Sequence, residues 1–115
     1  MDSILTSTKK LLGITEEDIS FDADIIMHIN SVFAILTQMG VGPDEGFYIE
    51  DKQDIWNDFI DDNLKLISVK SYMYLKVKLL FDPPASSALT EAMNRSISEF
   101  EFRLGTAAGE NQNGS

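Results

Sequence analysis

The segment from Leu64 to Phe81, LKLISVKSYMYLKVKLLF, constrains the fold more than any other part of the chain, because apolar residues recur at helical spacing along all of it. Two neighbouring stripes follow this spacing. The first, in which Ser71 and Lys78 are polar, is Leu64, Ile67, Ser71, Tyr74, Lys78 and Phe81, and the second is Leu66, Val69, Met73, Val77 and Leu80. Two adjacent stripes predict a helix buried over most of its circumference, with Leu75 and Leu80 in the core. The prolines of Asp82-Pro83-Pro84 end it.

Three further helices are expected. The first spans Ser3 to Leu12, with Asp2 or Ser3 as N-cap and Gly13 as its end. The second spans Asp22 to Met39, after an acidic linker. The fourth begins at Ser86 or Ser87 and runs to Leu104, because its apolar residues keep near-heptad spacing and Gly105 follows them.

Two segments do not follow a long helical period. Between Pro43 and Asp62, Phe47-Tyr48-Ile49 is β-prone, and the apolar residues from Ile55 to Ile60 suggest a helical turn or two. The segment from Gly105 to Ser115 has no periodicity, so we expect it to be disordered in the free protein. The predicted fold is mainly α: a small, four-helix bundle-like domain over residues 1–104 with a long buried third helix, a short β-prone or irregular insertion, and a flexible C-terminal tail over residues 105–115.

Charge and composition narrow the range of partners. The chain has 115 residues and a net charge of −10, with 9 Lys and Arg against 19 Asp and Glu. A sustained grip on nucleic acid needs clustered basic residues, so this balance argues against it. The N-terminus does not read as a signal peptide, and lysines interrupt the only long apolar run. We therefore expect a soluble protein, intracellular where it is made, that does not engage a membrane.

No metal, cofactor or catalytic site is expected. The chain has no cysteine and a single histidine, His28, which excludes thiolate zinc sites and the usual multi-histidine sites. The acidic run from Glu50 to Asp62 does not match a calcium loop, since Trp56 stands where that loop needs glycine. The glycines from Gly40 to Gly46 end a helix instead of opening one, so they do not form a phosphate loop.

His28 follows Asp24 by four residues, so the two share a helix face. No serine or cysteine nucleophile is placed by sequence to complete a catalytic set, and a surface or packed histidine paired with Asp24 is expected. Trp56, Tyr72 and Tyr74 belong to a residue class enriched at interfaces. For Tyr74 the core is favoured, whereas Trp56 is consistent with core or interface. The sequence predicts a non-enzymatic protein.

Several short phrases together resemble a known family. Phe21-Asp22-Ala23-Asp24-Ile25-Ile26-Met27-His28-Ile29-Asn30 opens the second helix, and Gln38-Met39-Gly40-Val41-Gly42-Pro43 closes it. Val69-Lys70-Ser71-Tyr72-Met73-Tyr74-Leu75-Lys76 leads to Leu79-Leu80-Phe81-Asp82-Pro83-Pro84. Over residues 1 to about 104 the chain resembles the head–tail connector (adaptor) proteins of tailed bacteriophages, often labelled DNA-packaging proteins.

The resemblance implies a structural virion protein of the phage neck, located at the head–tail interface and made in the bacterial host cytoplasm. It implies a homo-oligomeric ring, usually twelve-fold, that sits under the portal protein, extends the DNA channel and meets a head-completion, stopper or tail component. DNA would pass through without specific binding, because an acidic ring repels the phosphate backbone. The competing interpretation is an acidic phage-encoded binding module or inhibitor of a host protein.

The resemblance also suggests where partners bind. Residues 105–115 would dock on the portal, and residues 43–62 would face the tail or the channel. Lysines of the third helix could meet carboxylates of a neighbouring copy. The candidate interaction residues are Lys70, Lys76, Lys78, Phe47, Tyr48, Trp56, Gly105, Thr106, Glu110 and Asn111.

Overall fold

The structure is a computed structural model. It describes the backbone of residues 2–113 and the side chains of residues 2–106, and this part of the chain contains five helices. They are α1 (Ile4–Leu11), α2 (Asp22–Gln38), α3 (Trp56–Phe59), α4 (Asn63–Phe81) and α5 (Ser87–Asn113). The mainly α fold and its four long elements are confirmed. The short α3 is the helical turn expected before residue 60.

The helix starts and stops follow from local chemistry. The hydroxyl of Ser3 accepts a hydrogen bond from the Thr6 amide and caps α1. The carboxylate of Asp62 accepts from the amides of Leu64 and Lys65 and caps α4 in the same way. Gly13 follows α1 with φ +82°, a conformation that other residues adopt only at a cost.

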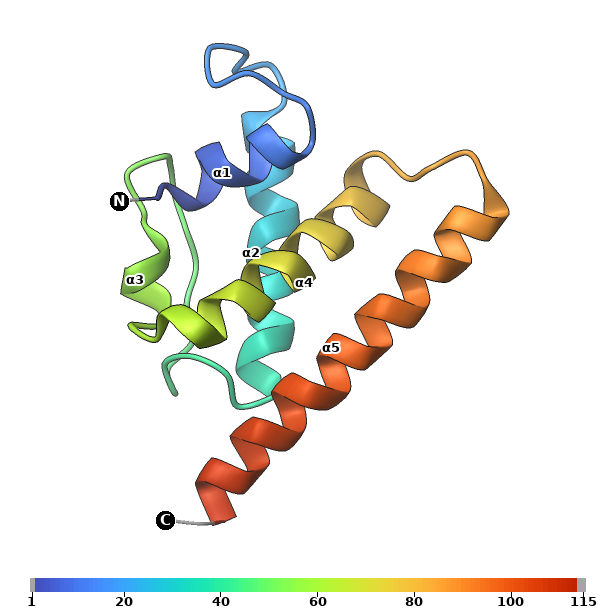
Figure 1. The fold of residues 1–115 in the computed structure, drawn as a ribbon. Coiled ribbons are helices and arrows are strands. Elements are labelled where there is room, and N and C mark those ends of the chain that lie inside the picture. Colours follow the sequence, from blue (N-terminus) through green and yellow to red (C-terminus); the bar gives the residue numbers. More distant parts are fainter. Residues whose placement is uncertain (1, 114–115) are drawn as a thin grey trace.

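The helices cross instead of running side by side as a regular bundle. Figure 1 shows α4 passing across α2, and α5 returning from the proline turn roughly antiparallel to α4. α1 packs against both α2 and α4, whereas α5 packs mainly against α4. α4 is therefore the element that joins all the other long helices.

The core contains only one of the two apolar stripes of α4. Four residues of the second stripe are buried against residues of α2 such as Phe33. They are Leu66, Val69, Met73 and Val77. The first stripe is largely open, since Leu64 is 81% exposed and Ile67 is 64% exposed. The prediction of a helix buried over most of its circumference is therefore wrong for the isolated subunit. Leu80, expected in the core, is 52% exposed, and Leu75 is half-buried.

The β-prone segment forms no strand among residues 2–113. At Ile49 the backbone hydrogen bonds are made by the side chain of Asn30, on α2, and not by a neighbouring strand. The Asn30 side-chain nitrogen donates to the Ile49 carbonyl at 3.0 Å, and the Asn30 side-chain oxygen accepts from the Ile49 backbone N–H at 2.8 Å. Ile49 is thereby buried at 1% exposure. One isolated antiparallel bridge, between Ser3 and Ile55, ties the N-terminus to the end of this insertion.

α5 extends further than expected. The prediction that Gly105 ends the helix is wrong, because the helical backbone continues to Asn113. A glycine inside a helix costs only about 1 kcal/mol, and good helix formers such as Ala107, Ala108 and Glu110 follow it. Among the described side chains of α5, which end at Thr106, the last one in the core is Leu104, at 5% exposure. The backbone of the later turns lies beyond the other helices at the lower end of Figure 1.

Candidate interaction surfaces

The three candidate lysines of α4 lie in different surroundings. The ammonium of Lys70 is 3.2 Å from the carboxylate of Asp2 and 5.9 Å from the centre of the Trp56 ring. Lys78 pairs with Asp82 at 2.8 Å, one turn further along the chain. Lys76 is half-buried. Two of the three charges therefore already have a partner within the subunit.

Trp56 is a core residue. Its side chain is 2% exposed, and its indole nitrogen donates a hydrogen bond to the Ser7 hydroxyl at 2.9 Å. It adjoins the aromatic cluster around Phe33, whose ring centre lies 6.1 Å away. Of the two interpretations that the sequence allowed for Trp56, the structure therefore favours the core.

The neighbouring candidates Phe47 and Tyr48 face opposite ways, as expected of extended backbone. Phe47 packs edge-on against Phe33 at 4.9 Å between ring centres and also contacts Phe59 at 5.3 Å. Tyr48 is 65% exposed. Its closest chain neighbours at the surface are acidic: Asp44, Glu45, Glu50 and Asp51 are all exposed. Tyr48 is thus a large, exposed amphipathic side chain in an acidic segment, which we call the Tyr48 edge (residues 44–51).

The C-terminal candidates all lie at the end of α5. Gly105 is half-buried, and a methyl group added to it would meet no atom within 4 Å. Thr106 is exposed. Glu110 and Asn111 belong to the helical backbone of α5, beyond the last residue with a described side chain. These four residues belong to α5, which packs along α4, the helix that carries the three candidate lysines.

An apolar hollow that the sequence did not reveal lies between three helices. It has a volume of about 370 Å³ and opens to the surface between the end of α1, the middle of α4 and α5. We call it the α1–α4–α5 groove; its lining residues are Leu11, Lys70, Ser71, Tyr74, Leu75, Ser96 and Phe100. Leu11 is 55% exposed, so a large apolar side chain borders an open hollow. Sequence periodicity could not find it, because its residues come from three elements.

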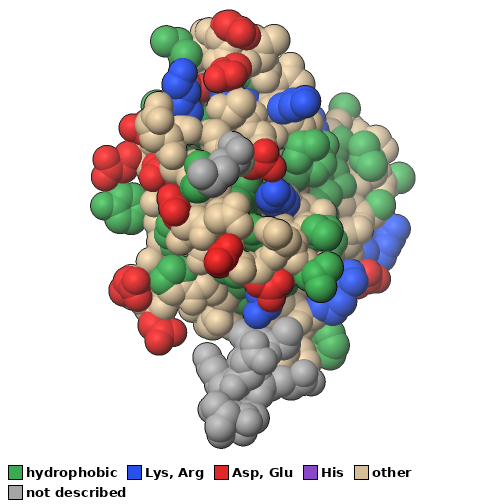
Figure 2. All heavy atoms as spheres, turned by 60° about the vertical axis from the view of Figure 1, so that its left-hand side comes forward, with side chains coloured by type: hydrophobic (Ala, Val, Ile, Leu, Met, Phe, Trp, Pro, Cys, Tyr) green, Lys and Arg blue, Asp and Glu red, His purple; other side chains and the backbone are tan. Residues whose placement is uncertain are grey.

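The charges of the surface are unevenly distributed. Figure 2 shows Asp and Glu side chains along the left-hand edge, at the top and through the middle of the face that it presents, whereas most of the hydrophobic, Lys and Arg side chains lie on the right-hand side. At the groove, Lys70 lines the hollow, and the guanidinium of Arg103 lies 5.0 Å from the Phe100 ring centre. Both apolar and basic groups are thus available on one side of the subunit.

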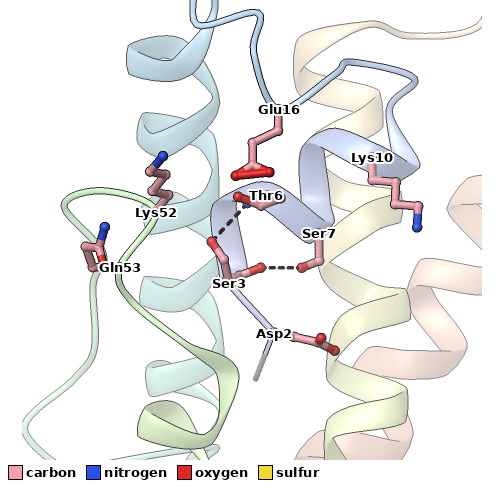
Figure 3. A pocket seen from close by; sticks show the side chains of 8 residues that line it. All are labelled: Asp2, Ser3, Thr6, Ser7, Lys10, Glu16, Lys52 and Gln53. Atoms are coloured by element: carbon pink, nitrogen blue, oxygen red, sulfur yellow. Dashed lines mark hydrogen bonds between the residues drawn. The ribbon is translucent and has the colours of Figure 1, made fainter.

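A larger but polar hollow, of about 580 Å³, lies at the start of α1. Figure 3 shows the hydroxyl groups of Ser3, Thr6 and Ser7 on one wall and Lys52 and Gln53 on the other. The Ser7 hydroxyl donates to the Ser3 carbonyl at 2.7 Å, so these groups are occupied by the helix itself. With Glu16 among its mixed charges, the hollow has no convergent set of groups for one ligand.

The charged groups with unusual surroundings have structural roles. Lys9 is buried at 2% exposure, and its ammonium lies 2.8 Å from the Asp22 carboxylate and 3.1 Å from the Glu16 carbonyl.

The Ser20 backbone amide donates to the Asp18 carboxylate and lowers the pKa of that exposed group. The Tyr72 hydroxyl donates to Glu101 at 2.8 Å. Burial of Tyr72, followed by this bond, raises the pKa of its phenol well above the ordinary range.

His28 packs against an aromatic ring instead of a carboxylate. Its ring centre lies 6.4 Å from that of Phe81, and the ion pairs of the described side chains do not include one with Asp24. The predicted pairing is therefore not seen. Within residues 2–106, no group of three or more metal-binding side chains converges. None of the helices, as far as they are described, is long and apolar enough to cross a membrane.

Comparison with known proteins gives one match. The family model described as phage connector protein matches residues 4–111, which is nearly the whole chain. The match covers α1 to α4 completely and α5 up to residue 111, past Gly105. Searches of curated proteins and of solved structures found no match.

Proposed function

Because the chain belongs to the phage connector protein family, we propose that it forms a ring beneath the portal of the phage head and extends the DNA channel toward the tail. Family membership supports a structural role in the phage neck. The match over residues 4–111 is the observation that carries the proposal. Its protein partners are the portal protein on one side and a head-completion, stopper or tail component on the other.

The acidic surface supports a channel role. The net charge of −10 means that a ring of copies concentrates negative charge around the passing duplex. Phosphates are repelled over roughly one Debye length, about 8–10 Å at physiological ionic strength. DNA therefore slides past the ring without binding specifically, and Lys and Arg are too few to hold it.

The end of α5 is the proposed portal-docking element. Residues 105–113 continue the α5 helix, and Figure 1 shows the backbone of its end beyond the other helices. A preformed helix loses less chain entropy on docking than a disordered tail does. Residues 43–62, the segment between α2 and α4, are proposed to face the tail component or the channel.

The experiment uses purified full-length protein and DNA-filled heads that carry the portal but lack the connector. We expect the protein to co-sediment with these heads, and electron microscopy to show a ring at the portal vertex. A truncated chain lacking residues 106–115 should keep its helical circular dichroism and lose binding.

Two outcomes count against this proposal. If the full-length protein fails to bind portal-bearing heads and instead forms a tight complex with a host protein, the chain acts as an inhibitor and not as a connector. If the truncated chain binds heads as well as the full chain does, docking takes place on the body of the subunit and not on the end of α5.

A further inference from the structure

Among the side chains of residues 2–106, none closes the α1–α4–α5 groove, which opens to the surface. Tyr74, Leu75 and Phe100 form its apolar floor, and the exposed Leu11 stands at its border. Large apolar groups left open in this way are typical of interaction sites. The open part of the α4 stripe, Leu64 and Ile67, belongs to the same helix.

The charges around the groove select an acidic occupant. Lys70 lines the hollow, and Arg103 stacks on Phe100. Lys10, the exposed chain neighbour of Leu11, lines the polar hollow at the start of α1. Within the subunit, Lys70 pairs with Asp2 at 3.2 Å, and Arg103 pairs with Glu99 at 3.8 Å. Both ion pairs are solvent-exposed. Exposed pairs of this kind exchange partners at little cost.

The Tyr48 edge is complementary to the groove. Tyr48 is 65% exposed, and the acidic residues within four positions of it along the chain, Asp44, Glu45, Glu50 and Asp51, are exposed as well. An aromatic side chain at the centre of a polar rim is the usual anchor of a protein interface. In Figure 2 the left-hand edge of the face is mainly acidic and the right-hand side is mainly apolar and basic, with further acidic side chains between them. One subunit cannot join its own two sides, but two subunits can.

We infer that the Tyr48 edge of one copy docks in the α1–α4–α5 groove of the next, with Tyr48 in the hollow and its carboxylates facing Lys10, Lys70 and Arg103. This contact is heterologous, because it joins two different surfaces. Such contacts repeat from copy to copy and close into rings when the rotation allows. The inference rests on the proposed ring and names the two surfaces that build it.

Cysteine pairing tests the contact directly, because the natural chain has no cysteine. Glu45→Cys labels the edge and Ser71→Cys labels the groove; both positions are exposed. A disulfide forms only when the two Cα atoms come within about 7 Å. We expect an equimolar mixture of the two variants, mildly oxidised at high concentration, to give several-fold more heterodimer than both homodimers together. Random encounters give heterodimer equal to the two homodimers combined.

Two controls make the result decisive. Met27→Cys, at a position that is 57% exposed on α2, replaces either partner and should return random pairing. Adding Tyr48→Ser to the Glu45→Cys chain should remove the excess heterodimer, with circular dichroism confirming that the variant is folded.

Random pairing in the original mixture overturns the inference, and so does an excess of the Ser71→Cys homodimer, which shows groove-to-groove contact. Neither result contradicts the proposed function if the wild-type protein still forms rings on portal-bearing heads. Failure of head binding with preferential edge-to-groove pairing would reject the portal role alone.

Discussion

The ammonium of Lys9 lies 2.8 Å from the carboxylate of Asp22 and is almost completely buried, so the end of α1 is tied to the start of α2 by an ion pair inside the fold. The Asp22 oxygen in this contact is itself buried and has no other hydrogen-bond partner. The pair closes the acidic loop of residues 13–21, and the Glu16 carbonyl accepts a second bond from Lys9.

Removal of one partner should be costly. Asp22→Ala leaves a buried ammonium without its counter-charge and is expected to lower the free energy of unfolding by about 3 kcal/mol, near the lower end for broken buried pairs because Asp22 is partly exposed. Chemical denaturation measures this. Asp24→Ala, at an exposed position in the same first turn, is the matched control and should cost about 1 kcal/mol or less. Equal losses in the two variants would show that the pair contributes nothing beyond the helix dipole.

Two leucines on α4 allow the same substitution on its two faces. Leu66→Ala, at 2% exposure, should lower the free energy of unfolding by about 2–5 kcal/mol through lost burial and a cavity. Leu64→Ala, at 81% exposure, should change it by no more than about 0.5 kcal/mol. Thermal and urea unfolding of the two variants provide the comparison. A large loss for Leu64→Ala would mean that the first stripe is covered in the free protein.

Two glycines separate backbone strain from steric overlap. Gly13 has φ +82° with nothing within 4 Å of an added Cβ, so Gly13→Ala should cost only the left-handed penalty of about 1–2 kcal/mol. Gly42 has φ +90°, and an added Cβ would overlap the Phe59 ring. Gly42→Ala should therefore cost roughly a further 1–3 kcal/mol. If urea unfolding shows the same loss of unfolding free energy for both variants, the ring of Phe59 does not lie as close to Gly42 as the structure places it.

The buried phenol of Tyr72 makes stability depend on alkaline pH. Its pKa is raised in the folded state above the ordinary value of 10.0, so the folded protein holds this proton more tightly than the unfolded chain does. Stability from this group is complete below about pH 10 and falls as pH rises beyond it. Tyr72→Phe should be less stable at neutral pH, since it loses the bond to Glu101, but should show a shallower alkaline decline.

Urea unfolding between neutral pH and pH 11 or so measures this dependence. Tyr74→Phe is the control for loss of a hydroxyl from the same helix, and we expect it to keep the wild-type pH profile. A Tyr72→Phe profile that runs parallel to the wild type would show that another group causes the alkaline decline.

Assembly on portal-bearing heads should weaken with salt. Contacts between acidic and basic side chains of neighbouring copies are screened as the Debye length shrinks to about 3 Å near 1 M. Light scattering or sedimentation of the isolated protein and of its complex with heads can follow this. Rings that become more stable with added salt would mean that general repulsion among acidic subunits dominates, and that the basic groups do not hold the copies together.

Local signals in the sequence were sufficient for the helices. Ser3 caps α1 as expected, Gly13 follows its end, and α2 and α4 begin and end within a residue of the predicted positions. These signals work because a cap, a glycine stop or a proline acts within one or two turns of backbone. Gly105 is the exception: a glycine permits a helix end but does not impose one, and no proline follows it.

Only the tertiary structure decided which apolar residues are covered. Leu64 and Leu66 are the same residue type two positions apart, yet one is open and the other is buried, because the packing of α2 and α5 on α4 leaves one face free. Burial of Lys9 and of Trp56 likewise depends on partners at Asp22 and Ser7, which periodicity cannot identify. The sequence by itself determined the helices and, through its resemblance, the family. The groove and the Tyr48 edge exist only where distant segments meet, since a surface is a property of packing and not of any one stretch of chain.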